Sequence, residues 1–170
     1  MRGKPVRDTR SDILATAREL FARSGYQRTS LREIAARLGL TKTAVLYHFP
    51  TKQEILLALT RPLLNDLDST LSTVEPGWPA VEAVLDCLLA HRHVVPLCQD
   101  PPSDRLAGAL AGARGLVAGR TPDLTTRVRA TQAVAMLTDP VLLLADAPTD
   151  ALRTAILSGV RRLLVPTTVR

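Results

Sequence analysis

Two short amphipathic segments joined by a turn of about three residues constrain the fold of this chain more than any other feature. Ser30 is of a residue type that caps helix N-termini, and Glu33, three positions later, completes the pattern of a capping box. The apolar face of the helix that follows consists of Leu31, Ile34, Ala35 and Leu38. Gly39 interrupts this pattern, and Thr41 is a good N-cap for a second short helix that ends near residue 48. The sequence therefore predicts a helix-turn-helix over residues 30–48.

Helical periodicity also runs through the rest of the chain. A helix is predicted from residue 8 or 9 to the stop signal at Gly25, and a capping box at Thr51 opens a long helix that Pro62 should kink without ending it. Further helices are predicted at about 81–93, 103–119, 123–145 and 150–164; the second of these is rich in Ala and Gly and therefore weak. No segment shows strand-like alternation or a Gly-rich phosphate loop, so the predicted fold class is all-α.

The positive charge of the chain is concentrated near its start. The net charge is +6, and residues 1–60 carry eleven Lys and Arg against five Asp and Glu, whereas residues 61–170 carry eleven of each. A module that binds a polyanion concentrates charge in this way, because its cations displace the counterions condensed on the phosphates. A basic N-terminal tail on an ordinary surface would give the same numbers, so charge alone leaves both interpretations open.

Cysteine usage and hydropathy indicate the compartment. Cys87 and Cys98 show neither a disulfide framework nor zinc-type spacing, so we expect reduced thiols in a cytoplasmic protein. The basic start lacks the apolar stretch of a signal peptide, and no run approaches the roughly 18 apolar residues of a membrane span. The sequence therefore predicts a cytoplasmic protein without a membrane partner.

The motif and its surroundings resemble the TetR family of transcriptional regulators. The resemblance rests on the run Gly25-Tyr26-x-x-Thr29-Ser30-Leu31-x-x-Ile34-Ala35-x-x-Leu38-Gly39-Leu40-Thr41-Lys42 and the closing Tyr47-His48-Phe49-x-x-Lys52. It covers about residues 9–60 and combines helix phase, turn glycine, aromatic positions and the final lysine in one register. It implies a DNA-binding domain in residues 1–55 and a helical effector-binding and dimerisation domain in residues 56–170, with a homodimer formed through the last two helices. The implied function is transcriptional regulation, usually repression, at a palindromic operator from which a small-molecule effector releases the protein.

The expected contacts with double-stranded operator DNA lie on and around the second helix of the motif. A helix fits the major groove, so the exposed face of residues 41–48 is the predicted recognition surface. The candidate DNA-binding residues are Thr29, Ser30, Thr41, Lys42, Thr43, Ala44, Tyr47, His48 and Lys52. Lys42 suits guanine acceptors, and Lys52 adds a phosphate contact by resemblance to the family. The threonines and the serine at helix starts would serve equally well as caps, and Tyr47 could instead pack against the first helix.

The sequence of the second domain gives little indication of an effector. Trp78, Leu85, Leu89, His91 and Met136 are candidates for the lining of an apolar pocket with a few polar groups, which suits a hydrophobic small molecule. Core packing is the simpler explanation for each of them taken singly. In a chain of 170 residues the second domain, residues 56–170, is short by comparison with the family that the motif resembles, so its pocket is expected to be small or absent.

Catalysis and metal binding lack candidate residues. His91 and His93 lie two positions apart and would point to different sides of a helix, and no nucleophile elbow, paired-carboxylate motif or Walker sequence is present. We therefore predict no enzyme, no cofactor and no metal. The alternative to a DNA-binding regulator is a helical adaptor that acts through protein contacts, and the local positive charge with Lys42, His48 and Lys52 argues against it.

Overall fold

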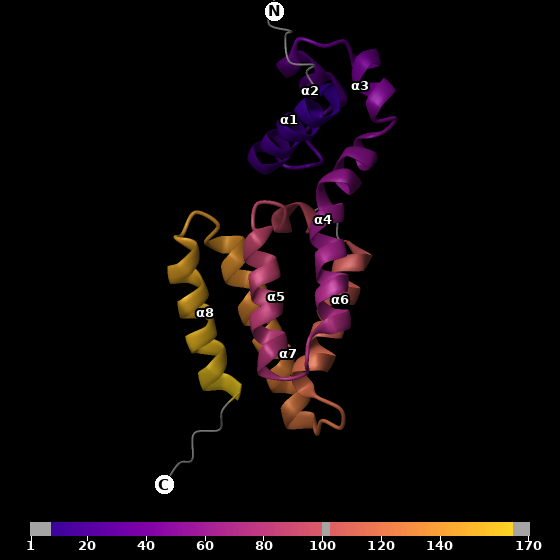
Figure 1. The fold of residues 1–170 in the computed structure, drawn as a ribbon. Coiled ribbons are helices and arrows are strands. Elements are labelled where there is room, and N and C mark those ends of the chain that lie inside the picture. Colours follow the sequence, from indigo (N-terminus) through magenta and orange to yellow (C-terminus); the bar gives the residue numbers. More distant parts are fainter. Residues whose placement is uncertain (1–7, 100–102, 165–170) are drawn as a thin grey trace, which may run out of the picture.

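The computed structural model describes residues 8–99 and 103–164, and within these ranges it is built from helices without a β-strand. The elements are α1 (Thr9–Ser24), α2 (Leu31–Leu38), α3 (Lys42–His48), α4 (Lys52–Thr73), α5 (Trp78–Ala90), the 3-10 helix η1 (Val95–Cys98), α6 (Asp104–Ala118), α7 (Leu124–Leu143) and α8 (Thr149–Leu164). Figure 1 shows α1 to α3 at one end, α5 to α8 at the other, and α4 running from one group into the other. The predicted all-α fold is confirmed.

The side chains of the described residues form two hydrophobic clusters. The first joins α1, α2, α3 and the start of α4, and its buried members are Ile13, Ala17, Leu20, Phe21, Ile34, Ala35, Val45, Phe49, Ile55, Leu56 and Leu97. The second joins α4 to α8 around residues such as Leu67, Leu85, Leu88 and Leu137. The predicted division at residue 55 falls inside α4, which contributes to both clusters.

The helix starts agree with the capping residues in the sequence. The hydroxyl oxygens of Ser30, Thr41 and Thr51 each accept a hydrogen bond from the backbone N–H three positions later, at 3.2, 3.1 and 3.1 Å. In the part of the chain that the structure describes, the return bonds from the Glu33 and Glu54 side chains are not formed, so each predicted capping box is half complete. Gly39 ends α2 in the left-handed conformation with φ 68°, which glycine adopts without a steric penalty.

The segment after α5 departs from the sequence-based prediction. The helix expected to reach residue 93 ends at Ala90, and η1 follows after a short turn. Val95 and Cys98 of η1 are buried in the second hydrophobic cluster, whereas Leu97 between them is 5% exposed and buried in the first. Periodicity could not reveal this element, because four residues are too few to show one.

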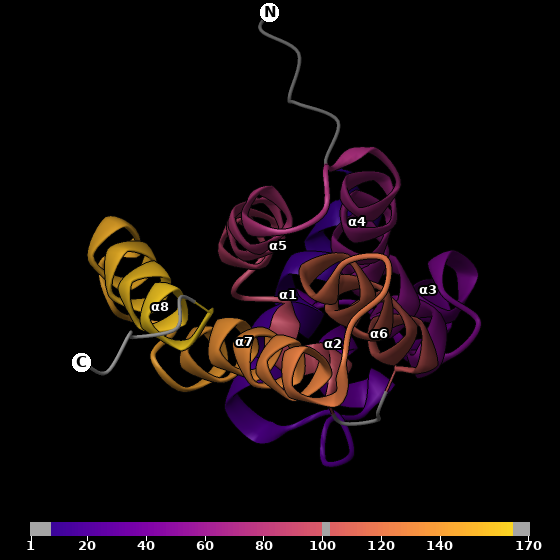
Figure 2. The same cartoon turned by 90° about the horizontal axis from the view of Figure 1, so that it is seen from below.

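The predicted weak helix at 103–119 is formed as α6. Leu106, Ala109 and Ala113 bury its inner face against the second cluster. Its glycines are not sites of close backbone approach: an added Cβ at Gly112 would meet the Leu71 side chain at an ordinary 3.6 Å. The tight contact lies elsewhere, at Gly159 of α8, where an added Cβ would come within 2.8 Å of the Met136 methyl group of α7. Figure 2 shows α7 and α8 side by side at one edge of the molecule.

Burial raises the pKa of both cysteine thiols. Cys87 and Cys98 are free and buried, and burial raises the pKa of each thiol to about 11. The Asp66 carboxylate adds a smaller upward contribution to the pKa of Cys87. Across residues 8–99 and 103–164, the helices fall short of the length and hydropathy that a membrane crossing requires.

Candidate nucleic-acid interface

The exposed face of α3 carries most of the predicted DNA-binding residues. Thr41, Lys42, Thr43 and Tyr47 are exposed, and Ala44 and His48 are half-buried. Tyr47 is 86% exposed, so it projects from the surface instead of packing against α1. Its ring meets the His48 ring edge-on, with centroids 5.3 Å apart. The helix thus offers an ammonium group, small side chains and two aromatic rings on one accessible surface.

The opposite face of α3 holds the helix in place. Val45 is fully buried and Phe49, directly after the helix, is 2% exposed, and both belong to the first hydrophobic cluster. The Arg10 guanidinium of α1 lies over the Phe49 ring at 4.7 Å from its centroid, a cation–π arrangement. Because buried contacts fix the back of α3, its exposed side chains have a defined position relative to α1 and α2.

Thr29, a predicted DNA-binding residue, is buried inside the protein. Its side chain is 1% exposed, and its hydroxyl donates to the carbonyl oxygens of Gly25 at 2.9 Å and Leu20 at 3.3 Å. The predicted contact with DNA would require the Thr29 hydroxyl to leave these two carbonyl oxygens. Ser30 next to it is exposed at the start of α2 and keeps its surface position.

Lys52 also has partners inside the protein. Its ammonium group donates to the carbonyl oxygens of Tyr26 at 2.7 Å and Thr29 at 2.9 Å, with a longer contact of 3.4 Å to Gln27. The same group lies 4.1 Å from the centroid of the Tyr26 ring. Three N–H donors therefore have three acceptors in the turn between α1 and α2. The predicted phosphate contact would require Lys52 to leave these partners.

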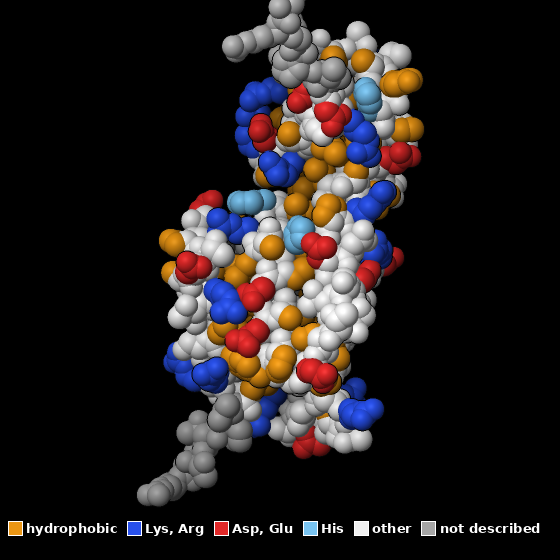
Figure 3. All heavy atoms as spheres, in the orientation of Figure 1, with side chains coloured by type: hydrophobic (Ala, Val, Ile, Leu, Met, Phe, Trp, Pro, Cys, Tyr) orange, Lys and Arg blue, Asp and Glu red, His pale blue; other side chains and the backbone are white. Residues whose placement is uncertain are grey.

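Basic side chains do not form one continuous patch on the face drawn in Figure 3. Three of the eleven basic residues in positions 1–60 lie in positions 1–7, outside the described residues. On the face drawn in Figure 3, Lys and Arg side chains lie on both halves of the molecule and are interspersed with Asp and Glu. The accessible surface of α3, and not a single large basic patch on this face, is therefore the feature that marks the candidate interface.

The structure does not gather the five candidate effector residues into one pocket. Leu85 and Leu89 are buried in the second cluster, and Met136 packs against it from α7. Trp78 lies beneath the Arg161 guanidinium of α8 at 4.7 Å, whereas His91 binds the Asp66 carboxylate at 2.7 Å on the α4 side. A cavity of about 410 Å³ lies elsewhere, between α4, η1 and α6. Sequence reasoning missed it because its walls come from three separate segments.

The chain is similar in sequence to known regulatory proteins of bacteria. Residues 13–59 match the family model for bacterial regulatory proteins of the tetR family, which spans α1 to the first turns of α4. The transcriptional regulator RutR of Escherichia coli O157:H7 is 28% identical over 130 residues, covering 75% of this chain and 60% of RutR. The transposon Tn10 TetC protein of Escherichia coli is 31% identical over 83 residues, covering 47% of this chain and 42% of TetC. The chain thus spans about half the length of these two curated relatives.

Solved structures extend the likeness over the second half of the chain. A transcriptional regulator from Aquifex aeolicus VF5 matches with a TM-score of 0.70 and 21% identity, covering 90% of this chain and 98% of that protein, which shows a shared fold. A transcriptional regulator from Rhodococcus sp. Rha1 matches with a TM-score of 0.60 and 26% identity over 92% of this chain and 96% of that protein. The matched family region contains the helix-turn-helix and its exposed α3, and the helices beyond it follow the same architecture. Residues 13–59 of this chain are thus similar to bacterial regulatory proteins of the tetR family, and the fold of the described residues is that of solved transcriptional regulators.

Proposed function

We propose that this protein regulates transcription by binding operator DNA as a homodimer, with α3 as the recognition helix. The observation that carries the proposal is the exposed surface of a firmly seated α3 within the region that matches the tetR family. Lys42 supplies the donor for guanine acceptors, and Thr43 and Ala44 are small enough to approach base edges. Tyr47 and His48 lie toward the end of the helix, where phosphates pass.

The proposed dimer contact is formed by α7 and α8. Six large apolar side chains are exposed in the described residues, and four of them, Leu124, Val128, Leu143 and Leu144, lie on α7 or directly after it. Exposed apolar side chains of this size mark surfaces that a partner covers. A twofold axis beside these helices would place two copies of α3 against two half-sites of one palindrome.

The proposed mode of action is repression that a small molecule relieves. Blocking of polymerase at the operator requires DNA binding alone, whereas release requires a ligand site in α4 to α8 that alters the position of the recognition helices. We place this activity in the cytoplasm, where bacterial DNA lies. The adaptor alternative is less well supported, because the accessible side chains of α3 suit the major groove of DNA.

The experiment that tests this function is selection of bound sites from random duplex DNA by the purified protein at near-physiological salt. A palindrome with half-sites about one helical turn apart is the expected product. Lys42→Ala should weaken binding to the selected site and relax the preference at one base position per half-site. Arg114→Gln, an exposed arginine on α6, is the matched control and should bind as the unmodified protein does. Binding without any enriched sequence would exclude the proposed function and favour the adaptor.

A further inference from the structure

The cavity between α4, η1 and α6 has one wall that follows a single face of α4 and combines three leucines with three polar or charged residues. Residues of α4 spaced three and four apart line it, namely Gln53, Leu56, Leu57, Thr60, Arg61 and Leu64. Leu97 and Cys98 of η1 and residues 103–105 at the start of α6 complete the lining. At about 410 Å³ the cavity lies within the range of small-molecule sites in proteins.

One exposed apolar side chain remains without a role in the proposed DNA and dimer surfaces. Of the six large apolar side chains exposed in the described residues, four belong to the α7 region and one is Tyr47 of the recognition helix. The sixth is Leu57, which is 50% exposed and lines the cavity. An apolar ligand in the cavity would cover this side chain, which gives its exposure a physical reason.

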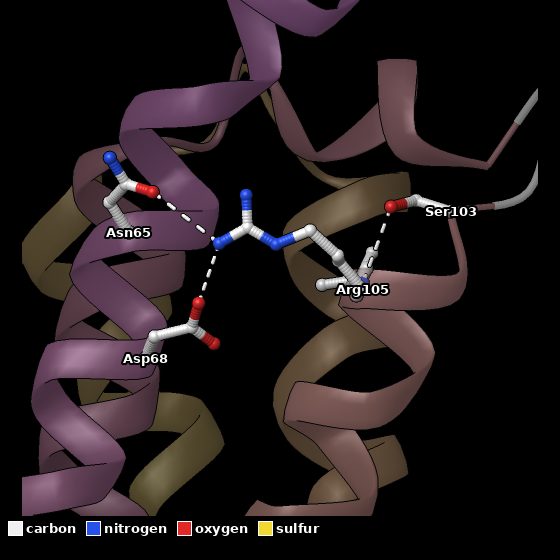
Figure 4. A network of polar contacts seen from close by, with 5 residues as sticks. Asn65, Asp68, Ser103 and Arg105 are labelled. Atoms are coloured by element: carbon white, nitrogen blue, oxygen red, sulfur yellow. Dashed lines mark hydrogen bonds and ion pairs between the residues drawn. The ribbon is translucent and has the colours of Figure 1, made fainter.

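The lining of the cavity contains three charged side chains. Arg61 and Arg105 line it together with one acidic residue, Asp104. The Arg105 guanidinium donates to the Asp68 carboxylate at 2.6 Å and lies 3.4 Å from the Asn65 side-chain oxygen, so its charge is already balanced from α4 (Figure 4). Arg61 forms no ion pair within the described residues. The cavity therefore presents apolar walls with a guanidinium that has no acidic partner there.

We propose that this cavity binds an acidic amphipathic small molecule, with its carboxylate at Arg61 and its apolar part along Leu56, Leu57 and Leu64. Arginine forms paired hydrogen bonds with a carboxylate, and the leucines remove the apolar part from water. As the effector site of the regulator, this inference rests on the proposed function. The inference that the cavity binds such a ligand depends only on the cavity and its lining residues.

Leu97 connects the cavity to the DNA-binding half of the molecule. It forms part of the cavity wall and is also a buried member of the first hydrophobic cluster, among the residues that seat α3. The α4 wall continues directly into the same cluster through Ile55 and Leu56. A ligand that separates α4 from η1 therefore acts on two elements that contact α1, which shares the first hydrophobic cluster with α3, and this is the physical route from occupancy to DNA affinity.

The first test is binding of straight-chain carboxylates, from octanoate to dodecanoate, to the full chain by calorimetry without DNA. Carboxylates should bind about tenfold more tightly than alcohols of the same length, because the charged hydrogen bond to Arg61 is absent in the alcohols. Arg61→Gln should remove this difference and Arg61→Glu should reverse it in favour of alkylamines. Arg114→Gln should leave it unchanged. Equal binding of acids and alcohols, or an undiminished preference in Arg61→Gln, would overturn the proposal.

A second variant tests the position of the site and its link to DNA. Leu57→Trp adds volume at a half-exposed position that tolerates it and should abolish binding of both acids and alcohols. Without ligand, the same variant should change affinity for the selected operator in the direction that the carboxylate does. Carboxylate binding that survives in Leu57→Trp would place the site elsewhere. If the protein bound no DNA sequence, the proposed function would be refuted. The preference for carboxylates over alcohols would still show whether the cavity binds an acidic ligand.

Discussion

Replacing Lys52 by methionine separates two roles of one ammonium group. Methionine keeps an unbranched apolar side chain but removes the ammonium group, and with it the donors to the carbonyl oxygens of Tyr26 and Thr29 and the cation–π contact with the Tyr26 ring. If the lysine holds the turn between α1 and α2 against the start of α4, the loss should appear as lower stability. If it binds a phosphate, the loss should appear in the salt dependence of DNA binding.

The contacts of the Lys52 ammonium group set the expected loss of stability in Lys52→Met. Two hydrogen bonds of 2.7 and 2.9 Å come from a charged donor, and the carbonyls that they leave regain water because the side chain is half-buried. Together with the cation–π contact at Tyr26, we expect the free energy of unfolding of the first cluster to fall by about 2–3 kcal/mol. The 3.4 Å contact to Gln27 is too long to add much.

Urea unfolding followed by circular dichroism, and hydrogen exchange of the α1 and α2 amides, measure the loss of stability. Affinity for the selected operator between low and high salt measures phosphate contacts, since each contact contributes about 0.9 to the slope of the logarithmic plot. We expect Lys52→Met to keep the slope of the unmodified protein. Lys42→Ala provides a control with unchanged stability, because this exposed lysine makes no hydrogen bond within the described residues. Unchanged stability together with a smaller slope in Lys52→Met would refute the structural role.

Three further predictions follow from buried or constrained groups. Thr29→Val should lower the free energy of unfolding by about 1–2 kcal/mol, because the carbonyl oxygens of Leu20 and Gly25 lose the hydroxyl that donates to them. The salt slope of DNA binding should stay constant, and a reduced slope would support Thr29 as a phosphate contact. Gly39→Ala should lower the free energy of unfolding, measured by thermal unfolding, by about 1 kcal/mol through backbone strain at positive φ. Strain is the only expected cause because an added Cβ meets nothing within 4 Å, so a loss of several kcal/mol would contradict it. The pKa values of about 11 for Cys87 and Cys98 lie above those of unfolded thiols, so the folded protein keeps protons that the unfolded chain releases. The contribution of the two thiols to stability should therefore be constant below about pH 8.5 and be lost as pH rises to about 11. A variant with alanine at both positions should lack this part of the fall in urea titrations.

Much of the fold was predictable because it depends on local signals. Ser30, Thr41 and Thr51 cap their helices as the sequence predicts, since capping involves atoms only two or three residues apart. The long helix continues through Pro62 because the apolar period resumes in phase after it. The register of α3 was equally accessible, because Val45 and Phe49 mark its buried side and leave Lys42 and Tyr47 on the other.

The site could not be predicted where it depends on contacts between distant segments. Lys52 meets the Tyr26 carbonyl across 26 positions, and no sequence pattern distinguishes this lysine from one that faces solvent. Thr29 has the residue type of a cap or of a phosphate ligand, and only its burial against Leu20 and Gly25 shows which atoms its hydroxyl meets. The five candidate effector residues were chosen for their chemistry, and chemistry alone does not reveal that Trp78 and His91 face different helices.

The packing of α1, α2 and α3 depends on Leu97, which lies far from these helices in sequence. A protein cut after residue 55 or 60 would keep all three helices of the motif but expose the apolar surface of the first cluster that Leu97 covers. Because Val95 and Cys98 are anchored in the second cluster, withdrawal of Leu97 would also disturb α4 to α8. The two halves should therefore melt as one cooperative unit, and the minimal DNA-binding fragment of this protein must include η1.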